Sequence, residues 1–414
     1  MAKMRIIVAI ALIFIVALTS TCYRPGGAES DPAANQPEAE QEIIDNQAPP
    51  QAQEAPLQAE NLGNTGDGVA DATPGDAPEE PEGPEEPEET EEPEELEELE
   101  EPEEPEPQST IRKVTISAAG DTTLGGDPRY SNQFIREFER RGQDHGFFMR
   151  GVKHIFQADE ISIVNFEGTL TDATAHSSTQ PYVFRGPAHF AKILSSSGIN
   201  VASLANNHSR DFFVAGYQDT RDALEAEGVS TIGDDHTLIL EVNDIRVGMF
   251  GFNFWGDSRA IRDKITAAIE ELRAGGAQLI IAYYHWGGEL DTRPRPYQRA
   301  VGRFTIDSGA DLVLGAHAHV LQGIEVYKGK NIVYSLGNFS FGGNNNPRDH
   351  DTMIFRQTFT FDDGVLQDTN DNQVIPARIS SERGRNNFQP IVAQGAVAER
   401  ILEKIQTYSD ELNA

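Results

Sequence analysis

The stretch KVTISAAGD, residues 113–121, decides the fold. Apolar and polar side chains alternate at its start and run into Gly120 and Asp121, as expected of a half-buried β-strand that ends at a polar residue. Four later stretches repeat this order, with an apolar run followed by Asp, Glu, Asn or His. They end in NFEG (165–168), NNHSRD (206–211), HWGGE (285–289) and GAHAH (315–319). The repeated order predicts loops at the carboxyl edge of one sheet that gather these polar side chains.

Helical periodicity separates the predicted strands. We expect strands at 113–118, 161–164, 199–204, 278–284 and 311–315 and helices at 147–156, 188–196, 214–227, 258–273 and 296–308. Toward the C-terminus the pattern changes to consecutive strands at 322–327, 331–335, 353–361 and 373–380. A mixed α/β core with an added β layer predicts two packed sheets flanked by helices.

The acidity of the chain belongs to one segment. The formal net charge is −34, yet residues 25–111 contain no Lys or Arg and 29 Asp or Glu, which leaves about −8 for residues 112–414. Residues 79–106 are a near-repeat of Glu-Glu-Pro that cannot bury enough apolar surface to offset its ordering entropy. We therefore predict a disordered linker at 23–111, either a solvated spacer or an element that repels anionic polymer or collects cations. No nucleic-acid partner is expected.

The N-terminus is typical of an export signal. Two basic residues, Lys3 and Arg5, precede the apolar run 6–18, which is short for a membrane-spanning helix. The only cysteine, Cys22, follows Thr-Ser-Thr, where a bacterial lipoprotein would be cleaved and lipidated. A lipoprotein, an uncleaved signal anchor and full secretion stay open. Each places the folded part outside the cytoplasm, and the first two place it at the cell membrane.

The polar residues after the strands have the chemistry of metal ligands. Carboxylate, amide oxygen and imidazole together suit Mn²⁺, Fe or Zn²⁺ better than Ca²⁺, and two adjacent cations would activate a bridging water. A single histidine at a strand end is more often a structural hydrogen-bonding residue. Four of the ten histidines, however, lie in the motifs. The other six match no motif: His145, His154, His176, His189, His236 and His350.

The order of the motifs resembles a known family. GD, N-x-E, NNH, HWG-x-E, G-x-H-x-H and then YSLGNF (334–339) are similar to the CapA family, which is associated with bacterial poly-γ-glutamate capsule synthesis and belongs to the calcineurin-like metallophosphoesterase superfamily. The resemblance covers residues 112–380 and leaves 381–414 as a partly helical extension. It implies a four-layer α/β/β/α fold.

The resemblance also implies a role for each motif residue in a site with two divalent metal ions. Asp121 would bind the first ion, Glu167 would bridge both, Asn207 and His285 would bind the second, and His317 and His319 would be divided between the two. His208 would face the substrate as a general acid or stabilise charge in the transition state. In an extended GAHAH segment, alternate histidines point to the same side. Both can therefore bind metal only with a bend or a shared pair of ions.

Five further residues are candidates near this site. Asp211 and Glu289 are expected to orient metal-bound histidines, and Asn206 precedes the Asn-His pair. Arg185 is either an anion contact or a surface arginine, and Trp286 either packs in the core or forms a substrate platform. The superfamily has Asp-x-His where this chain has Asp-Thr-Thr at 121–123, so the first ion loses an imidazole ligand.

Two functions follow from these expectations. The first is hydrolysis or transfer at a phosphoester or amide by a metal-activated water. The second is a non-catalytic scaffold that organises a membrane synthase or guides an anionic polymer such as poly-γ-glutamate. The intact Asn207-His208 pair favours the enzyme, since a scaffold needs no acid beside the metals. A serine hydrolase is disfavoured, because the chain has no Gly-x-Ser-x-Gly motif.

Overall fold

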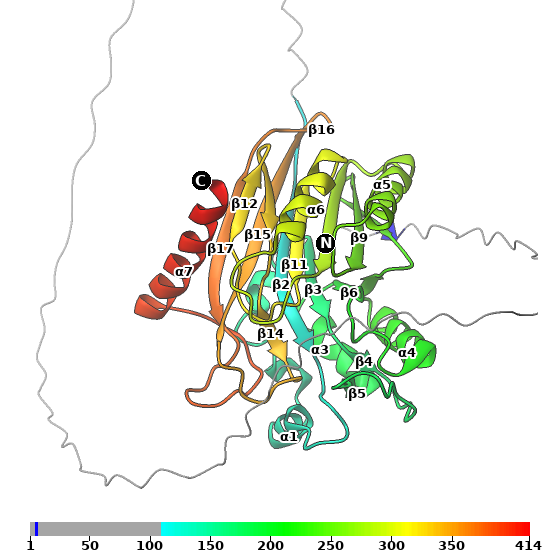
Figure 1. Cartoon of the computed structure of the whole chain (residues 1–414), viewed down its shortest axis with the longest axis vertical. Helices are drawn as coiled ribbons and strands as arrows, with labels where there is room; N and C mark the ends of the chain where they lie inside the picture. The colour runs from blue at the N-terminus through cyan, green and yellow to red at the C-terminus, as the bar shows by residue number, and fades with distance from the viewer. Residues whose placement is uncertain (1–4, 7–108) are drawn as a thin grey trace, which may run out of the picture. The chain divides into compact units, whose positions relative to one another are not determined.

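The computed structural model describes residues 5–6 and 109–414, and two β-sheets packed face to face form its centre (Figure 1). The predicted signal segment, Cys22 and the acidic linker up to residue 108 lie outside the described residues, apart from Arg5 and Ile6.

The first sheet has a parallel centre and an antiparallel flank. Its order is β18-β17-β15-β2-β3-β6-β7, with β14 beside β2 and β16 beside β15. Strands β14, β2, β3, β6 and β7 run parallel, while β15, β16, β17 and β18 pair antiparallel. The bounds are β2 (Ile111–Thr123), β3 (Ile161–Phe166), β6 (Val201–Ser203), β7 (Ser230–Ile232), β14 (Asn338–Phe341), β15 (Asp351–Asp362), β16 (Val365–Leu366), β17 (Asp371–Arg378) and β18 (Ile391–Val392).

The second sheet has the order β1-β8-β9-β10-β11-β13-β12. Its strands β9, β10, β11 and β13 are parallel, and the others join them antiparallel. The bounds are β1 (Arg5–Ile6), β8 (Leu238–Val242), β9 (Ile245–Asn253), β10 (Leu279–His285), β11 (Leu312–Ala316), β12 (Ile324–Tyr327) and β13 (Lys330–Val333). Two short strands, β4 (Thr169–Leu170) and β5 (Arg185–Gly186), pair outside both sheets.

All of the described helices except the last cover the outer faces of the sheets. The helices are α1 (Gln133–Arg140), α2 (Lys153–Phe156), α3 (Ala191–Ser195), α4 (Phe213–Ala226), α5 (Arg259–Ala274), α6 (Pro296–Asp307) and α7 (Gly395–Asn413), with 3₁₀ turns η1 (His145–Phe147) and η2 (Ala188–Phe190). The local sequence sets where two of these helices begin. The Ser258 side chain accepts from Ile261 N at the start of α5, and Pro296 is the first residue of α6.

Three apolar clusters define four layers. Along β10, Leu279, Ile281 and Tyr283 pack between the two sheets, whereas Ile280, Ala282 and Tyr284 pack with residues of α5 and α6 on the outer face. The outer face of the first sheet carries a third cluster with α1 to α4. This α/β/β/α arrangement confirms the predicted fold class.

Helix α7 lies against β12 of one sheet and β17 of the other (Figure 1, red). Its Ile401 and Ile405 are buried in the cluster between the sheets. The segment after residue 380 therefore adds to the core of the domain and closes one side of the sandwich.

The predicted helix at 147–156 was wrong over most of its length. The structure has η1 and the four-residue α2 instead. Asp144 caps η1 by accepting from Gly146 N, and Gly151 lies between the two turns. Glycine disfavours a continuous helix here. Helix α1 and strands β8 and β9 were not predicted from the sequence.

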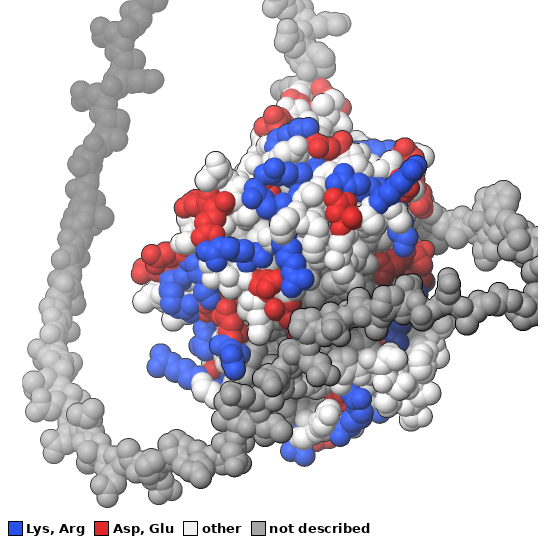
Figure 2. Space-filling model, viewed as in Figure 1, with Lys and Arg blue, Asp and Glu red and all other residues white. Residues whose placement is uncertain are grey.

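The surface charge of the folded part is mixed. Figure 2 shows acidic and basic side chains interspersed over the visible face. Within residues 109–414, no helix has the length and apolarity that crossing a membrane requires.

Candidate metal centre

The polar motif residues meet where five strands end. Asp121 lies near the end of β2, Glu167 follows β3, Asn207 follows β6, His285 ends β10 and His317 follows β11. The expectation of one sheet edge was wrong, because the first three strands belong to one sheet and the last two to the other. The sheets pack face to face with their carboxyl ends together, so each contributes to the same centre.

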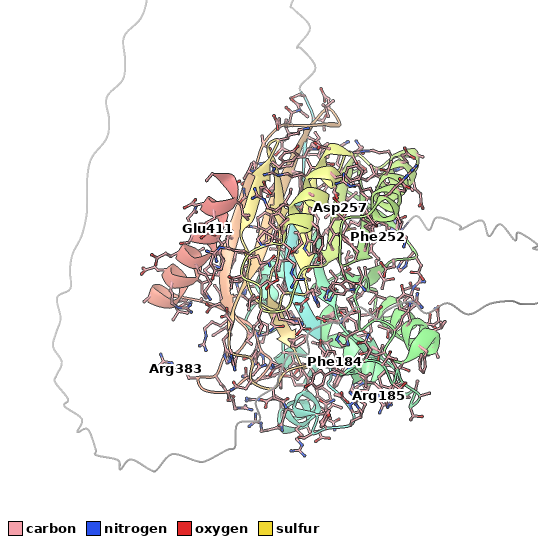
Figure 3. The ribbon with its side chains drawn as sticks, in the orientation of Figure 1. Phe184, Arg185, Phe252, Asp257, Arg383 and Glu411 are labelled. Carbon is pink, nitrogen blue, oxygen red and sulfur yellow. The ribbon has the colours of Figure 1, made fainter. Side chains whose placement is uncertain are left out.

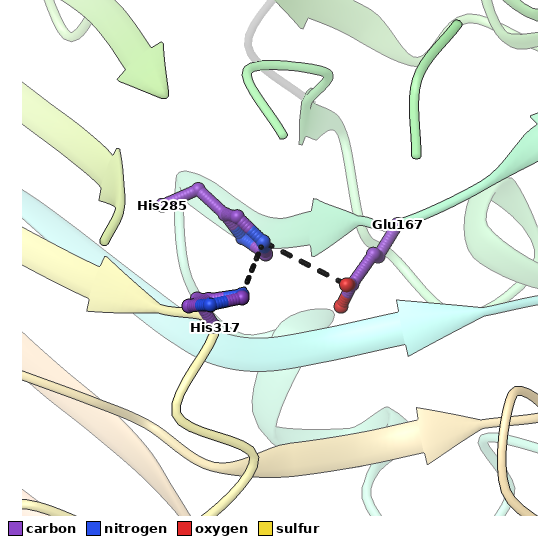
Figure 4. A group of neighbouring side chains, drawn as sticks. All are labelled: Glu167, His285 and His317. Atoms are coloured by element: carbon purple, nitrogen blue, oxygen red, sulfur yellow. Dashed lines mark hydrogen bonds and ion pairs between the residues drawn. The ribbon is translucent and has the colours of Figure 1, made fainter. Parts of the chain in front are cut away.

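Three potential ligand atoms surround Nε2 of His285. Asn207 Oδ1 lies 2.7 Å away, His317 Nδ1 3.0 Å and Glu167 Oε1 3.6 Å. Figure 4 shows the side chains of Glu167, His285 and His317 pointing toward one another. Ligands about 2.1 Å from one ion lie roughly 3–3.4 Å apart. The group therefore has the spacing of a cation site.

A second group also includes Glu167. Asp121 Oδ2 is 3.0 Å from His319 Nδ1, and His319 Nε2 is 3.8 Å from Glu167 Oε1. Glu167, His285 and His317 form one set that could hold a metal, and Asp121, Glu167 and His319 form another. Glu167 is thus common to both sets.

Glu167 is fully buried, and neither of its carboxylate oxygens has a hydrogen-bond partner among the described residues. Burial raises the pKa of Glu167 well above its usual range. A buried carboxylate without a partner is costly unless a cation compensates its charge. The carboxylate therefore fits a position between two cations.

The histidines differ in their protonation. Burial lowers the pKa of His285 well below its usual range and lowers that of His317 to about 4, so both present a neutral imidazole. Burial alone would also lower the pKa of His319, but the carboxylates of Glu167 and Asp121 raise it to about 10. The His319 position therefore favours positive charge, whether carried by a proton or by a metal ion.

The backbone bends through both histidines of the GAHAH motif. The φ angle is 89° at His317 and 57° at His319, in the left-handed region that non-glycine residues rarely adopt. The bend sends the two imidazoles to different sets, so the expected division of His317 and His319 agrees with their positions.

Two glycines allow the strands to approach one another at the centre. A Cβ at Gly120 would lie 1.9 Å from Gly337 O, and one at Gly315 would lie 2.1 Å from Tyr334 O. The adjacent Asp121 N donates to Gly337 O at 2.9 Å. A side chain at the glycine of either motif, GD or GAHAH, would therefore clash with the neighbouring backbone.

His208 points at the centre from one side. Its Nε2 lies 4.0 Å from Glu167 Oε1, while its Nδ1 lies 2.8 Å from Asp211 Oδ2. The same oxygen accepts from Phe184 N at 2.6 Å, and the Phe184 ring packs 4.2 Å from the imidazole. Burial raises the pKa of Asp211. These contacts leave Nε2 free to face a ligand.

Comparison with known proteins identifies the family. Residues 115–343 match the model of the family described as bacterial capsule synthesis protein PGA_cap. The chain belongs to this family. The match includes every residue of the two sets described above.

Two relatives of the chain come from Bacillus. The capsule biosynthesis protein CapA of Bacillus anthracis is 29% identical over 254 residues, which cover 55% of this chain and 60% of that one. The PGA biosynthesis protein CapA of Bacillus subtilis is 29% identical over 249 residues, which cover 55% and 63%. The match thus spans less than two thirds of either relative. A hypothetical protein from Thermus thermophilus aligns with a TM-score of 0.38 and 14% identity over 64% of this chain and 99% of its own.

The remaining candidate residues differ in their burial and in their contacts. Asn206 is buried and holds its loop, donating to Phe166 O at 2.8 Å and accepting from His208 N at 3.1 Å. The Arg185 guanidinium donates to Ala173 O and lies 5.3 Å from the Phe212 ring. Trp286 is fully buried and donates to Tyr334 O, so it packs in the core. Glu289 is exposed and has no hydrogen bond to a histidine within residues 109–414.

Three residues beside the centre had no role predicted from the sequence. Asn165 donates to Asp121 Oδ1 at 2.8 Å and lies 3.2 Å from His285 Nδ1. Asn338 Oδ1 lies 3.0 Å from His319 Nδ1. The Trp255 ring packs 4.5 Å from that of His317. Asn165 and Asn338 lie within the quoted motifs NFEG and YSLGNF, which is the signal that could have found them.

Proposed function

We propose that this chain acts in the synthesis, export or attachment of an anionic capsule polymer of the poly-γ-glutamate type. The family match supports a role in capsule synthesis, and the two Bacillus relatives carry the names capsule biosynthesis protein and PGA biosynthesis protein. Because the match leaves more than a third of each relative uncovered, the polymer and the partners in a membrane synthase belong to the proposal.

We propose further that the centre holds two divalent cations and hydrolyses a phosphoester or an amide. One ion would be held by Asp121, Glu167 and His319, and the other by Glu167, Asn207, His285 and His317. The observation that carries this proposal is Glu167, whose unpartnered, buried carboxylate is common to the two sets. Bound cations would lower the pKa of a water and withdraw charge from the oxygen of the scissile group.

The protein residues supply orientation and a proton. Asp211 and Phe184 fix the ring of His208, so that Nε2 faces the same space as Glu167. In this position His208, as an imidazolium paired with Asp211, would donate its Nε2 proton to the leaving oxygen or nitrogen and become the neutral ring with its proton on Nδ1. Asn165 would hold Asp121 and His285 in place through its amide nitrogen.

One observation favours the scaffold. Thr123, two residues after Asp121, stands where the superfamily has a histidine. Its hydroxyl donates to Glu167 O at 2.6 Å. That hydroxyl already bonds the backbone, so the set with Asp121 has one ligand fewer. Weaker binding of one ion would leave a protein that binds polymer without cleaving it.

Metal analysis and a substrate screen on the purified full-length chain separate these functions. We expect two equivalents of Mn, Fe or Zn together with metal-dependent cleavage of phosphoesters or γ-glutamyl peptides. Polymer binding without cleavage of either class would favour the scaffold. A chain that binds none of these metals would contradict the proposed centre.

We also propose that the domain lies on the outer face of the cell membrane, attached through residues 1–22. The basic start, the apolar run 6–18 and Cys22 support attachment. The acidic linker would then hold the domain away from the membrane surface.

A further inference from the structure

An exposed indole forms one wall of the candidate metal centre. Trp255 comes two residues after Asn253, the Cα partner of His285 across the β9–β10 pair. Its ring lies 4.5 Å from that of His317 and 6.2 Å from that of His285, between centroids. Trp255 therefore stands beside the set that contains both of these imidazoles.

The other aromatic rings that touch the histidines are buried. Phe184, on His208, is 5% exposed, and Phe341, whose ring lies 4.7 Å from that of His319, is 4% exposed. Trp255 is 51% exposed. The two phenylalanines pack against imidazoles inside the fold, whereas half of the Trp255 surface remains available to a ligand.

The surroundings of Trp255 leave room for such a ligand. A Cβ added at the next residue, Gly256, would meet no atom within 4 Å. Asp257, labelled with Phe252 in Figure 3, is the nearest acidic residue in sequence. Arg262 donates to both of its oxygens at 2.7 Å and offsets its charge. An anionic chain lying over Trp255 would therefore meet no unpaired carboxylate at Asp257.

We propose that Trp255 contacts the substrate and selects an extended chain of amide units. This inference rests on the proposed function and names its substrate class as a γ-linked glutamate oligomer. Planar amide groups and methylene groups can cover an indole face and remove apolar area from water, while the carboxylates of the chain stay solvated. Inorganic phosphate has no planar or apolar group that could cover the indole.

The two tryptophans of the chain provide a direct readout. Trp286 is fully buried, so a change in intrinsic fluorescence on adding a ligand reports on Trp255. We expect a γ-linked oligoglutamate to shift the emission of the full-length, metal-loaded chain in a saturable manner. Trp255→Phe should abolish this response, and inorganic phosphate should not produce it.

Kinetics distinguish substrate contact from structural support. Trp255→Ala should raise KM for oligoglutamate by about tenfold, a larger change than it causes in KM for p-nitrophenyl phosphate, with unchanged metal content. Val365→Ala, which removes an exposed apolar side chain on β16, is the matched control and should change neither. An equal loss on both substrates, or a loss of metal, would assign Trp255 to support of His317 and overturn the proposal.

The two proposals can fail separately. If the wild-type chain cleaves the phosphoester but oligoglutamate leaves its emission unchanged, Trp255 is not a substrate contact and the metal centre stands. If the chain binds no metal, the proposed function falls. The emission titration, carried out without metal, then still decides whether Trp255 contacts the oligomer.

Discussion

The His208 imidazole is held at one nitrogen by Asp211, with Nδ1 2.8 Å from Oδ2, and presents the other nitrogen to the space beside Glu167. Asp211 is fully buried, and its Oδ2 also accepts from the backbone of Phe184. The pair therefore fixes both the tautomer and the direction of the ring. The neutral ring then presents a basic Nε2, and the imidazolium form, whose charge Asp211 would balance, presents an oriented proton at Nε2.

Replacing His208 should separate catalysis from metal binding. His208→Ala should keep its metal and its melting temperature, yet lose turnover by roughly 10²–10⁴-fold, because proton transfer to the leaving group is removed. Steady-state kinetics, metal analysis and thermal melting are compared with those of His154→Ala, a change at an exposed histidine in α2. Unchanged turnover in His208→Ala would place the scaffold ahead of the enzyme.

Asp211→Asn tests the orientation of the same ring. The amide keeps the size of the side chain but loses the acceptor charge that fixes the tautomer of His208. We expect kcat to fall by less than in His208→Ala, with metal content unchanged. A smaller loss of kcat in Asp211→Asn than in His208→Ala would show that His208 transfers the proton and that Asp211 positions its ring.

Glu167→Gln should reverse its effect on stability according to the metal present. With metal at about 100 times its Kd, loss of the shared carboxylate should remove up to roughly 2–3 kcal/mol of stabilisation by mass action. In chelator the variant should equal or exceed the wild type, because an unpartnered buried carboxylate is no longer present. Denaturant titrations in both conditions measure this, with Glu139→Gln, at an exposed residue of α1, as control.

A different result would contradict the shared site. If Glu167→Gln lowers the free energy of unfolding equally with and without metal, the carboxylate serves the fold alone. His317→Ala provides a second check, because it removes a ligand from only one set. It should lose more of one ion than of the other.

The sequence predicted the positions of the site residues better than their surroundings. Asp121, Glu167, Asn207, His285 and the histidines of GAHAH all follow apolar runs, which predicts polar residues at strand ends. That the strands belong to two sheets was not predicted. The left-handed backbone at His317 and His319 is set by tertiary packing and has no local sequence signal. The exposure of Glu289 had no local sequence signal either. This residue follows the turn at Gly287, where φ is 98°.

Trp255 was missed because its strand was missed. The predicted strands omitted β8 and β9, so nothing in the sequence analysis placed residue 255 beside His317. Asn165 was quoted as part of NFEG, but its role depends on a register shift between β2 and β3 near Ala119 and Asp121. Such irregularities depend on contacts across the sheet, which periodicity along one strand does not report.

The acidic linker should be dispensable for folding, because the domain has its own core and the linker has few apolar residues. A chain truncated to residues 110–414 should be soluble and melt within a few degrees of the full-length protein. Thermal melting and limited proteolysis check this. Aggregation of the shorter chain, or a linker that resists protease, would show that the linker packs on the domain.

Cys22→Ser should decide between the anchoring models. Under lipidation the substitution should abolish acyl labelling and alter processing, whereas a signal anchor would not respond. Metabolic labelling and membrane fractionation of both forms provide the measurement. A wild-type chain found in neither the labelled nor the membrane fraction would rule out attachment through residues 1–22.

The ion pairs of α7 give the fold a pH dependence. Arg400 donates to both oxygens of Asp351 at 2.6 and 2.5 Å, and Lys404 donates to one of them. Burial alone would raise the pKa of Asp351, which is 4% exposed, but these hydrogen bonds hold it below its usual range. A lowered carboxylate pKa stabilises the native state above about pH 4 and ceases to do so as pH falls through the folded-state pKa.

Removing the cations of this cluster should therefore destabilise the domain at neutral pH. The double variant Arg400→Ala/Lys404→Ala leaves a buried carboxylate unpaired. It should lower the free energy of unfolding by about 2 kcal/mol, less than the roughly 3–5 kcal/mol of a fully buried pair, because the Arg400 side chain is 52% exposed. Denaturant titrations at pH 7 and pH 3 should show this difference shrinking at the lower pH. A difference that is the same at both pH values would mean that the apolar stems of the two side chains, rather than the charge of Asp351, hold α7 in place.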